Sequence, residues 1–326
     1  MTVGRAELEA SLRHLAAGVR DPHAGIYGPE SLAWQVNRDV VLLLGGGCAA
    51  LLQLAHPFVA EAVREHSRTR QDVQGRFLRT FANVFAMVFG DLEHALAAAR
   101  RVHSVHERVT GVLAQGGGRF RAGTRYAAND PGALLWVHAT LARTALDVHE
   151  RVVGRLTASD RELYWEESKR FAALFGLDDA HVPRTWVDFE RYFDTAVREQ
   201  VEVGTAARET AEFLMTPATR VHAPLAEWYR VMTAGLLPDL LRAQYGLRFG
   251  RRERLVFDAS IRALALGQSR VPRRLRFFPA YLEAERRMRG VDGRDRVART
   301  LQRFVIRSSL GNPLEALVGR RAAPAR

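Results

Sequence analysis

Cysteine and lysine are almost absent from this sequence. Cys48 is the only cysteine and Lys169 the only lysine among 326 residues. A single cysteine excludes an intrachain disulfide and any zinc or iron–sulfur site built from several cysteines. The net charge of +12 therefore comes almost entirely from arginine. These arginines are spread along the chain rather than concentrated on one element, so we expect no nucleic-acid partner, while contact with an anionic membrane surface stays open.

Long apolar runs are also missing. The most apolar stretch, residues 40–55, is interrupted by Gly45, Gly46, Gly47 and Gln53. It is shorter than the roughly 20 residues of a membrane-spanning helix, and we interpret it as a buried core helix. The first residues lack the basic-then-apolar pattern of a signal peptide. Together these features predict a cytoplasmic protein.

Long alternating runs typical of β-strands do not occur, and no internal repeat is found. Helix-starting signals are frequent instead: Ser31, Asp91, Asn129-Asp130-Pro131, and Ser159 with Glu162 three residues later. The sequence therefore predicts an all-α fold, with residues 119–128 as the place for a small hairpin. The predicted helices cover residues 31–44, 48–55, 59–65, 71–89, 92–113, 131–153, 159–176, 185–199, 204–214, 224–236, 238–245, 252–266 and 294–306.

A histidine interrupts an apolar stripe in one of these helices. Alternate steps of three and four residues connect Leu92, Ala95, Ala99, Val102, His106, Val109 and Leu113. These residues share one helix face, which is expected to point into a core. A buried imidazole needs a partner, because an unpaired buried polar group costs about 1–3 kcal/mol. The partner is a backbone carbonyl, a carboxylate or a metal, haem iron included.

The preceding helix has a polar line beside its apolar face. The apolar face comprises Val73, Phe77, Phe81, Val84 and Val88, and the adjacent line comprises Arg76, Thr80, Asn83 and Met87. A tight turn at Gly90-Asp91 predicts that the two helices pack antiparallel. Arg76, Thr80 and His106 would then meet in one pocket. The pattern alone favours a plainer interpretation, in which His106 is a satisfied core histidine and the arginine–threonine line is a solvated edge.

The chain also resembles the family of MpaB-type oxygenases and rubber oxygenases (latex clearing proteins). The resemblance covers about residues 25–285, and the order and spacing of its short motifs make it specific. The matching stretches are Leu44-Gly45-Gly46-Gly47, Leu52-Gln53-Leu54-Ala55-His56-Pro57-Phe58-Val59-Ala60, His66-Ser67, Gly75-Arg76-Phe77-Leu78-Arg79-Thr80, Phe89-Gly90, His106-Glu107-Arg108-Val109-Thr110-Gly111, Tyr126-Ala127-Ala128-Asn129-Asp130-Pro131, Trp136-Val137-His138-Ala139-Thr140, Tyr164-Trp165-Glu166-Glu167, Leu237-Pro238 and Tyr245-Gly246-Leu247.

The resemblance implies a single large helical domain that encloses a b-type haem. By position, His106 corresponds to the proximal iron ligand, and Arg76 and Thr80 to its companions in the site. Rubber oxygenases carry a lysine directly before this threonine, where it can occupy the distal iron position. Arg79 stands there in this chain, next to the haem but as a poor iron ligand, because arginine stays protonated. The distal side is therefore expected to be open or water-bound.

Four further histidines and two glutamates enter the hypothesis. His56 and His66 lie in family motifs and are candidates for the distal pocket, although His56 before Pro57 equally suits a helix end. His138 is expected to make a structural hydrogen bond. His103 lies about 60° around the helix from His106, so both are not expected to face one iron. Glu61 and Glu65 are candidate acids, with a solvated helix face as the plainer interpretation.

The sequence thus predicts a haem-dependent oxygenase that acts with O2 on a hydrophobic organic substrate, with oxidative C=C cleavage by analogy. His106 would bind iron through Nε2 while an acceptor holds its other ring nitrogen. We expect three regions: an N-terminal extension (1–24), the catalytic domain (25–285), and a basic C-terminal helix and tail (286–326). The alternatives are a non-catalytic helical binder of haem or lipid, and an oxidoreductase that uses another metal or none. The oligomeric state stays open.

Overall fold

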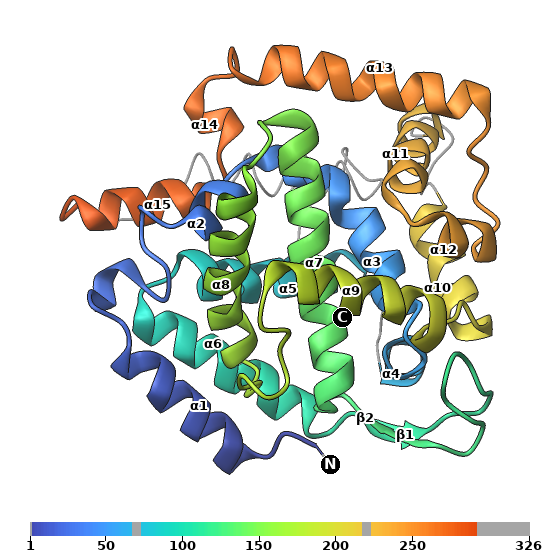
Figure 1. The fold of residues 1–326 in the computed structure, drawn as a ribbon, viewed down its shortest axis with the longest axis horizontal. Helices are drawn as coiled ribbons and strands as arrows, with labels where there is room; N and C mark the ends of the chain where they lie inside the picture. Colours follow the sequence, from blue (N-terminus) through green and yellow to red (C-terminus); the bar gives the residue numbers. More distant parts are fainter. Residues whose placement is uncertain (1, 67–72, 217–222, 292–326) are drawn as a thin grey trace, which may run out of the picture.

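The computed structural model describes residues 2–66, 73–216 and 223–291, with the side chains of residues 73–79 excepted. Within this part the all-α prediction is confirmed (Figure 1). The elements are α1 (Arg5–Ala17), η1 (Pro22–Ala24), α2 (Leu32–Asn37), η2 (Val40–Gly45), α3 (Gly46–Leu54), α4 (Pro57–His66), α5 (Val73–Phe89), α6 (Leu92–His106), β1 (Thr110–Val112), β2 (Arg125–Ala127), α7 (Pro131–Val152), α8 (Ala158–Ala173), α9 (Trp186–Thr195), η4 (Ala196–Gln200), α10 (Thr205–Met215), α11 (Ala223–Leu236), α12 (Asp239–Gln244), α13 (Arg251–Gln268), α14 (Arg273–Arg276) and α15 (Pro279–Met288).

Helix α7 passes through the middle of the molecule (Figure 1). It begins where the sequence predicts, because the Asp130 side chain accepts a hydrogen bond from the Ala133 amide at 2.9 Å and Pro131 occupies the first turn. Its buried side chains are distributed along its whole length, and η2, α3, α8 and α13 pack against it. The main apolar core therefore forms around this helix.

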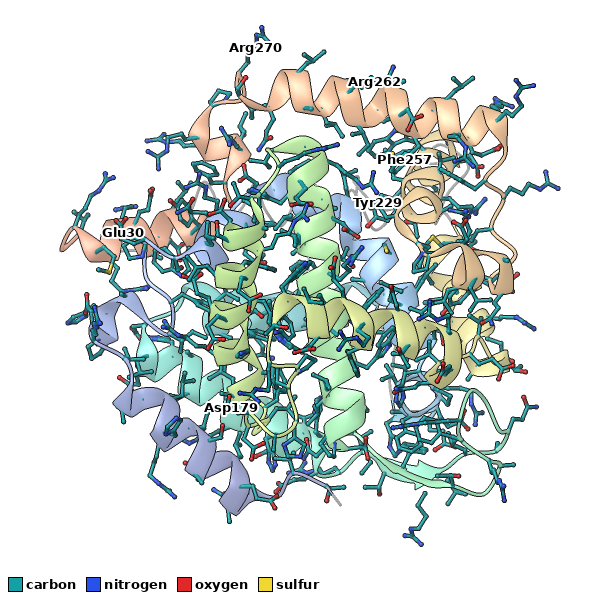
Figure 2. All side chains as sticks on the ribbon, in the orientation of Figure 1. Glu30, Asp179, Tyr229, Phe257, Arg262 and Arg270 are labelled. Atoms are coloured by element: carbon teal, nitrogen blue, oxygen red, sulfur yellow. The ribbon has the colours of Figure 1, made fainter. Side chains whose placement is uncertain are left out.

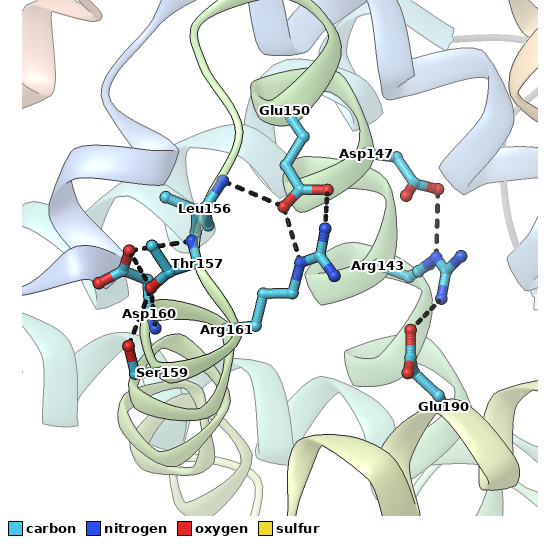
Figure 3. A network of polar contacts seen from close by, with 9 residues as sticks. All are labelled: Arg143, Asp147, Glu150, Leu156, Thr157, Ser159, Asp160, Arg161 and Glu190. Atoms are coloured by element: carbon cyan, nitrogen blue, oxygen red, sulfur yellow. Dashed lines mark hydrogen bonds and ion pairs between the residues drawn. The ribbon is translucent and has the colours of Figure 1, made fainter.

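Charged side chains connect α7 to its neighbours (Figure 3). Arg161 of α8 donates two hydrogen bonds to Glu150 of α7, at 2.8 and 3.0 Å. Arg143 of α7 donates to Asp147 at 3.2 Å and lies 3.7 Å from Glu190 of α9. The start of α8 has the predicted kind of cap, but two residues earlier than predicted. Thr157 and Asp160 form the box, and not Ser159 and Glu162.

The predicted end of α6 is wrong. The helix stops at His106 rather than at residue 113, and residues 110–112 form strand β1 instead. This strand pairs antiparallel with β2, which lies inside the segment 119–128 predicted as a hairpin. Helices α1, α14 and α15 were not predicted. The helix predicted at 294–306, and the rest of the C-terminal tail, lie outside the described residues.

The prediction that residues 40–55 belong to the core is confirmed, since Leu44, Cys48, Leu51 and Leu52 are buried. The predicted helix bounds are wrong here, because the helix expected at 31–44 ends at Asn37 and residues 40–55 are divided between the 3-10 helix η2 and helix α3. No single described helix is long and apolar enough to cross a membrane. One pair, Val40–Leu54 with Pro57–His66, reaches that length and composition together but is bent by 99°.

Two glycines of this segment permit close packing. A Cβ at Gly45 would lie 2.5 Å from Thr144 Cγ2 of α7, and one at Gly47 would lie 2.3 Å from Thr233 Oγ1 of α11. Tyr229 of α11 completes the contact, donating to the Leu43 carbonyl and accepting from the Gly47 amide (Figure 2). The glycine triplet therefore lies where α3 meets two other helices.

Candidate functional site

His106 is the last residue of α6. The Asp91 side chain caps the start of this helix, as predicted, by accepting from the His94 amide at 2.8 Å. After His106 the chain leaves the helix, and the His106 carbonyl accepts from the Val109 amide at 2.9 Å. His106 therefore stands at a junction between a helix and a hairpin.

The His106 ring is held neutral and lacks a partner at one nitrogen. Burial lowers its pKa to about 4, and the nearby Asn129 side chain opposes that effect only in part. Its Nδ1 is buried and has no hydrogen-bond partner among the described residues. The acceptor expected on the second ring nitrogen is therefore absent, and the free buried nitrogen is Nδ1 rather than Nε2, the predicted ligand atom. A neutral imidazole with a free buried nitrogen suits an external ligand such as a metal.

His103, three residues earlier, differs from His106. Its buried ring donates from Nε2 to the Val3 carbonyl at 3.0 Å, and its Nδ1 lies 3.6 Å from Glu107. The Val3 amide in turn donates to the Asn129 carbonyl at 2.9 Å. Both His103 nitrogens thus face protein groups, so His103 is the structural histidine of α6.

The hairpin fixes the chain after His106. Gly111 of β1 lies opposite Tyr126 of β2, and a Cβ at Gly111 would be only 2.6 Å from Tyr126 Oη. The Tyr126 hydroxyl donates to Glu65 Oε2 at 2.5 Å, and burial followed by this hydrogen bond raises the pKa of Tyr126. Only glycine permits the strands to close this tightly, so the hairpin and α4 together brace the end of α6.

The pairing of α5 with α6 brings the predicted companions of His106 to its level. Both helices flank the short turn at Gly90, and they pack extensively on each other. Arg101 of α6 donates to Asn83 Oδ1 of α5 at 3.5 Å. Because the helices run in opposite directions, residues equally far from this contact lie at the same level. His106 lies five residues after Arg101, and it is therefore level with position 78, which lies five residues before Asn83. The turn of α5 that carries Arg76, Arg79 and Thr80 is therefore level with His106.

Of these three residues, only Thr80 has a described side chain, and it is exposed. Farther along the same line of α5, Met87 is buried. The side chains of Arg76 and Arg79 lie outside the described residues. Their contact with a haem, and the enclosing pocket itself, remain predictions from sequence and from the helix register.

The candidates in and directly before α4 are engaged with protein groups. The buried His56 accepts at Nδ1 from the Phe58 amide at 3.2 Å, and burial followed by the charge of Arg119 lowers its pKa to about 3. His66 is exposed and lies 3.0 Å from the Thr110 carbonyl. Glu61 is buried and paired with Arg64. This pair lines a cavity of about 170 Å³ between α4, α10 and residues 113–117, which is small for a cofactor pocket.

His138 lies at the centre of α7. Its ring packs against Trp165 and Phe171, with centroids 5.5 and 6.0 Å apart. Burial lowers its pKa to about 4. Its Nε2 makes no hydrogen bond to a described residue, so the structural hydrogen bond expected for His138 is absent at that atom.

The donor set restricts which cofactor the site suits. No group of three or more His, Cys, Asp or Glu side chains that could hold a metal ion occurs among the described residues. A haem needs only one protein ligand, because the porphyrin itself supplies four nitrogens to the iron. The neutral His106 ring, with its unpartnered Nδ1, fits that requirement. The structural signal that the sequence could not reveal is Asn129, a buried neighbour of this ring.

Comparison with known proteins agrees with the sequence resemblance. The curated relatives include one protein of Mycobacterium tuberculosis and one of Mycobacterium bovis, both described as uncharacterised. Each is 26% identical over 159 residues, which is 47% of this chain and 61% of the relative. The match thus spans less than two thirds of these relatives. No solved structure matches the chain significantly.

A family profile described as "ER-bound oxygenase mpaB/B'/Rubber oxygenase, catalytic domain" matches residues 34–266. This range extends from α2 to α13 and contains α5, α6, the hairpin and His106. It covers well over half of the chain. The protein therefore belongs to the family of mpaB-type and rubber oxygenase catalytic domains.

Proposed function

We propose that this oxygenase-family protein binds haem b through His106 and uses O2 to oxidise a hydrophobic organic substrate. The observation that carries the proposal is the neutral His106 ring with its unpartnered buried nitrogen, level with the turn of α5 that carries Arg76, Arg79 and Thr80. Family membership supports the oxygenase class. Haem, substrate class and C=C cleavage are inferences from the resemblance and the donor set.

The residues of the site would have separate roles. His106 stays neutral at physiological pH because burial lowers its pKa to about 4, so a ring lone pair is available to iron. Arg76 would hold a haem propionate or an anionic group through its guanidinium, and Thr80 would orient either by hydrogen bonding. Arg79, permanently protonated, would lie beside the haem without ligating its iron. When bound, the haem supplies an iron centre that activates O2.

An absorption spectrum tests this proposal directly. Protein expressed with a haem precursor is expected to show a Soret band and a pyridine haemochrome of the b type, and His106→Ala is expected to lose both. The matched control is His103→Gln on the same helix, whose amide can still donate to the Val3 carbonyl. Thermal melts of each variant report whether the fold is kept. A folded His106→Ala protein with wild-type haem content would refute the ligand assignment.

Turnover separates the enzyme from the rival functions. O2 uptake with a lipophilic alkene is expected in the haem-loaded wild type and not in His106→Ala. Haem spectra without uptake for any candidate substrate would favour a binder. Absent haem, with another metal found by elemental analysis, would favour a different oxidoreductase.

A further inference from the structure

Helix α13 lies along one edge of the molecule with its inner face firmly anchored (Figure 2). Phe257 is buried against α11, where a Cβ at Gly235 would lie 2.3 Å from Phe257 Cδ2. Trp228 of α11 donates from Nε1 to Ser260 Oγ at 2.9 Å. These contacts fix the rotation of α13 about its own axis, and hence which residues face outward.

The outward side carries exposed leucines. Steps of four, three and four residues join Leu255, Ala259, Arg262 and Leu266, which share the helix face opposite Phe257. We call these four residues the α13 outer face. Leu255 is 71% exposed and Leu266 70%, the two highest values among the described large hydrophobic residues that are exposed. Val271 and Leu275 continue the exposed apolar surface beyond the helix. Exposed large apolar side chains gathered along one helix and the segment after it are typical of a contact surface.

Arginine dominates the segment that carries this face, although Arg273 and Arg276 pair with Glu285 and Asp39. Residues 248–276 contain nine arginines and two acidic residues, Glu253 and Asp258. Glu253 is engaged at the helix start, where it accepts from the Gly250 amide at 2.8 Å. The exposed Arg251, Arg252, Arg262 and Arg270 form no ion pair within the described part of the chain, and Figure 2 shows Arg270 pointing away from the body. The surface therefore has unneutralised positive charge around exposed leucines.

Exposed leucines among unpaired arginines favour a lipid bilayer over a second copy of the chain, its own C-terminal residues or nucleic acid. Apolar side chains flanked by arginine suit the headgroup boundary of an anionic bilayer, where leucine enters the acyl region and arginine meets lipid phosphates. A second copy of the chain would bring like charges together. The chain's own residues 292–326 are also basic, with eight arginines against three acidic residues. Nucleic acid would contact the arginines but leave the leucines without an apolar partner.

We propose that the α13 outer face is a docking surface for an anionic lipid bilayer. The leucines enter the headgroup layer while Arg251, Arg252 and Arg262 pair with lipid phosphates. Docking here holds α13 parallel to the membrane plane. The surface is formed by the fold alone, so this inference does not depend on the identity of the cofactor.

Vesicle sedimentation of the full-length protein tests the surface. The probes are phosphatidylcholine vesicles with and without one-third phosphatidylglycerol. We expect binding to the anionic vesicles alone, weakening at high salt. Leu255→Ser/Leu266→Ser is expected to reduce binding roughly tenfold or more, since two leucines lose their buried area. Arg251→Gln/Arg252→Gln/Arg262→Gln is expected to reduce it ~100-fold, at about fivefold per arginine.

The matched control is Leu163→Ser/Val187→Ser, which removes exposed hydrophobic residues of α8 and α9 and should leave binding unchanged. All substituted side chains are exposed, and thermal melts verify the fold. Equal binding by wild type and the leucine variant would overturn the proposal, because another part of the chain would then hold the vesicle. So would equal binding to neutral vesicles, binding to duplex DNA in preference to vesicles, or a dimer that the leucine variant abolishes.

Discussion

At the scale of single residues, three histidines have strongly lowered pKa values. Burial lowers the pKa of His56 to about 3 and those of His106 and His138 to about 4. An unfolded chain would protonate these rings near pH 6.5, so between about pH 6.5 and 4 the unfolded state binds more protons than the native state. The free energy of unfolding therefore rises with pH in this window and falls as the solution is acidified.

His138→Phe is predicted to flatten this pH dependence. A shift from 6.5 to about 4 corresponds to a loss on the order of 3 kcal/mol on full acidification. Phenylalanine keeps the ring contacts with Trp165 and Phe171 and has no group to protonate. Urea unfolding at pH 7 and pH 5 measures the difference, with the surface variant His14→Phe as control. If His138→Phe loses as much stability as the wild type on acidification, His138 is not among the responsible groups.

The sequence identified His106 because periodicity reports which helix face is buried. The same periodicity failed to predict where the helix ends, because the apolar spacing continues through Val109 and Leu113, which lie after the helix. Leu113 is buried against Phe58, Tyr126 and Ala133 in the hairpin's own small cluster. The free Nδ1 and the neighbouring Asn129 depend on contacts between distant segments, which spacing along one helix does not encode.

At the scale of elements, the hairpin after α6 is predicted to control the site. Gly111→Ala would place a Cβ 2.6 Å from Tyr126 Oη and 2.7 Å from Cζ. Tyr126 cannot retreat freely because its hydroxyl is bonded to Glu65. We expect a loss of about 1–3 kcal/mol in unfolding free energy and weaker haem retention, since the end of α6 would shift.

The matched control for this substitution is Gly154→Ala, where a new Cβ meets nothing within 4 Å. Denaturant unfolding and Soret titration measure the two effects separately. Wild-type stability and haem binding in Gly111→Ala would show that the hairpin does not brace His106.

Three of the helix starts that were predicted from the sequence have a side-chain cap. Ser31, Asp91 and Asp130 each accept from a backbone amide three residues later, as local chemistry requires. The cap of α8 was misplaced because Thr157 and Ser159 both precede an acidic residue by three positions. Glu162 instead accepts from the Trp186 amide at 2.9 Å, a contact 24 residues away. Helices α14 and α15 lack a side-chain cap hydrogen bond, and the local signal that the prediction missed is Pro279 in the first turn of α15.

At the scale of the whole molecule, the C-terminal helices attach to an early segment through one buried carboxylate. Asp39 is fully buried, and its Oδ1 accepts from Gln268 Nε2 at 2.7 Å and Arg276 Nε at 2.8 Å. Beside it, the Phe278 amide donates to the Arg38 carbonyl at 2.8 Å. These partners are more than 200 residues apart, so no local pattern predicts that the two segments meet.

Asp39→Ala is predicted to release α14 and α15 from the rest of the molecule. Removing the carboxylate leaves Arg276 partly buried without its counter-ion, and breaking a buried pair costs about 3–5 kcal/mol. Backbone amides of α14 and α15 should then exchange hydrogen faster. The exchange rates of α7 amides should change only as far as the global free energy of unfolding changes. The control is Asp239→Ala, an exposed partner of Arg242, for which we expect a loss below about 1 kcal/mol. If Asp39 is a local clamp, faster exchange is confined to the segment that it holds. Equal acceleration of amide exchange in all helices would instead show that the C-terminal helices unfold only with the rest of the molecule.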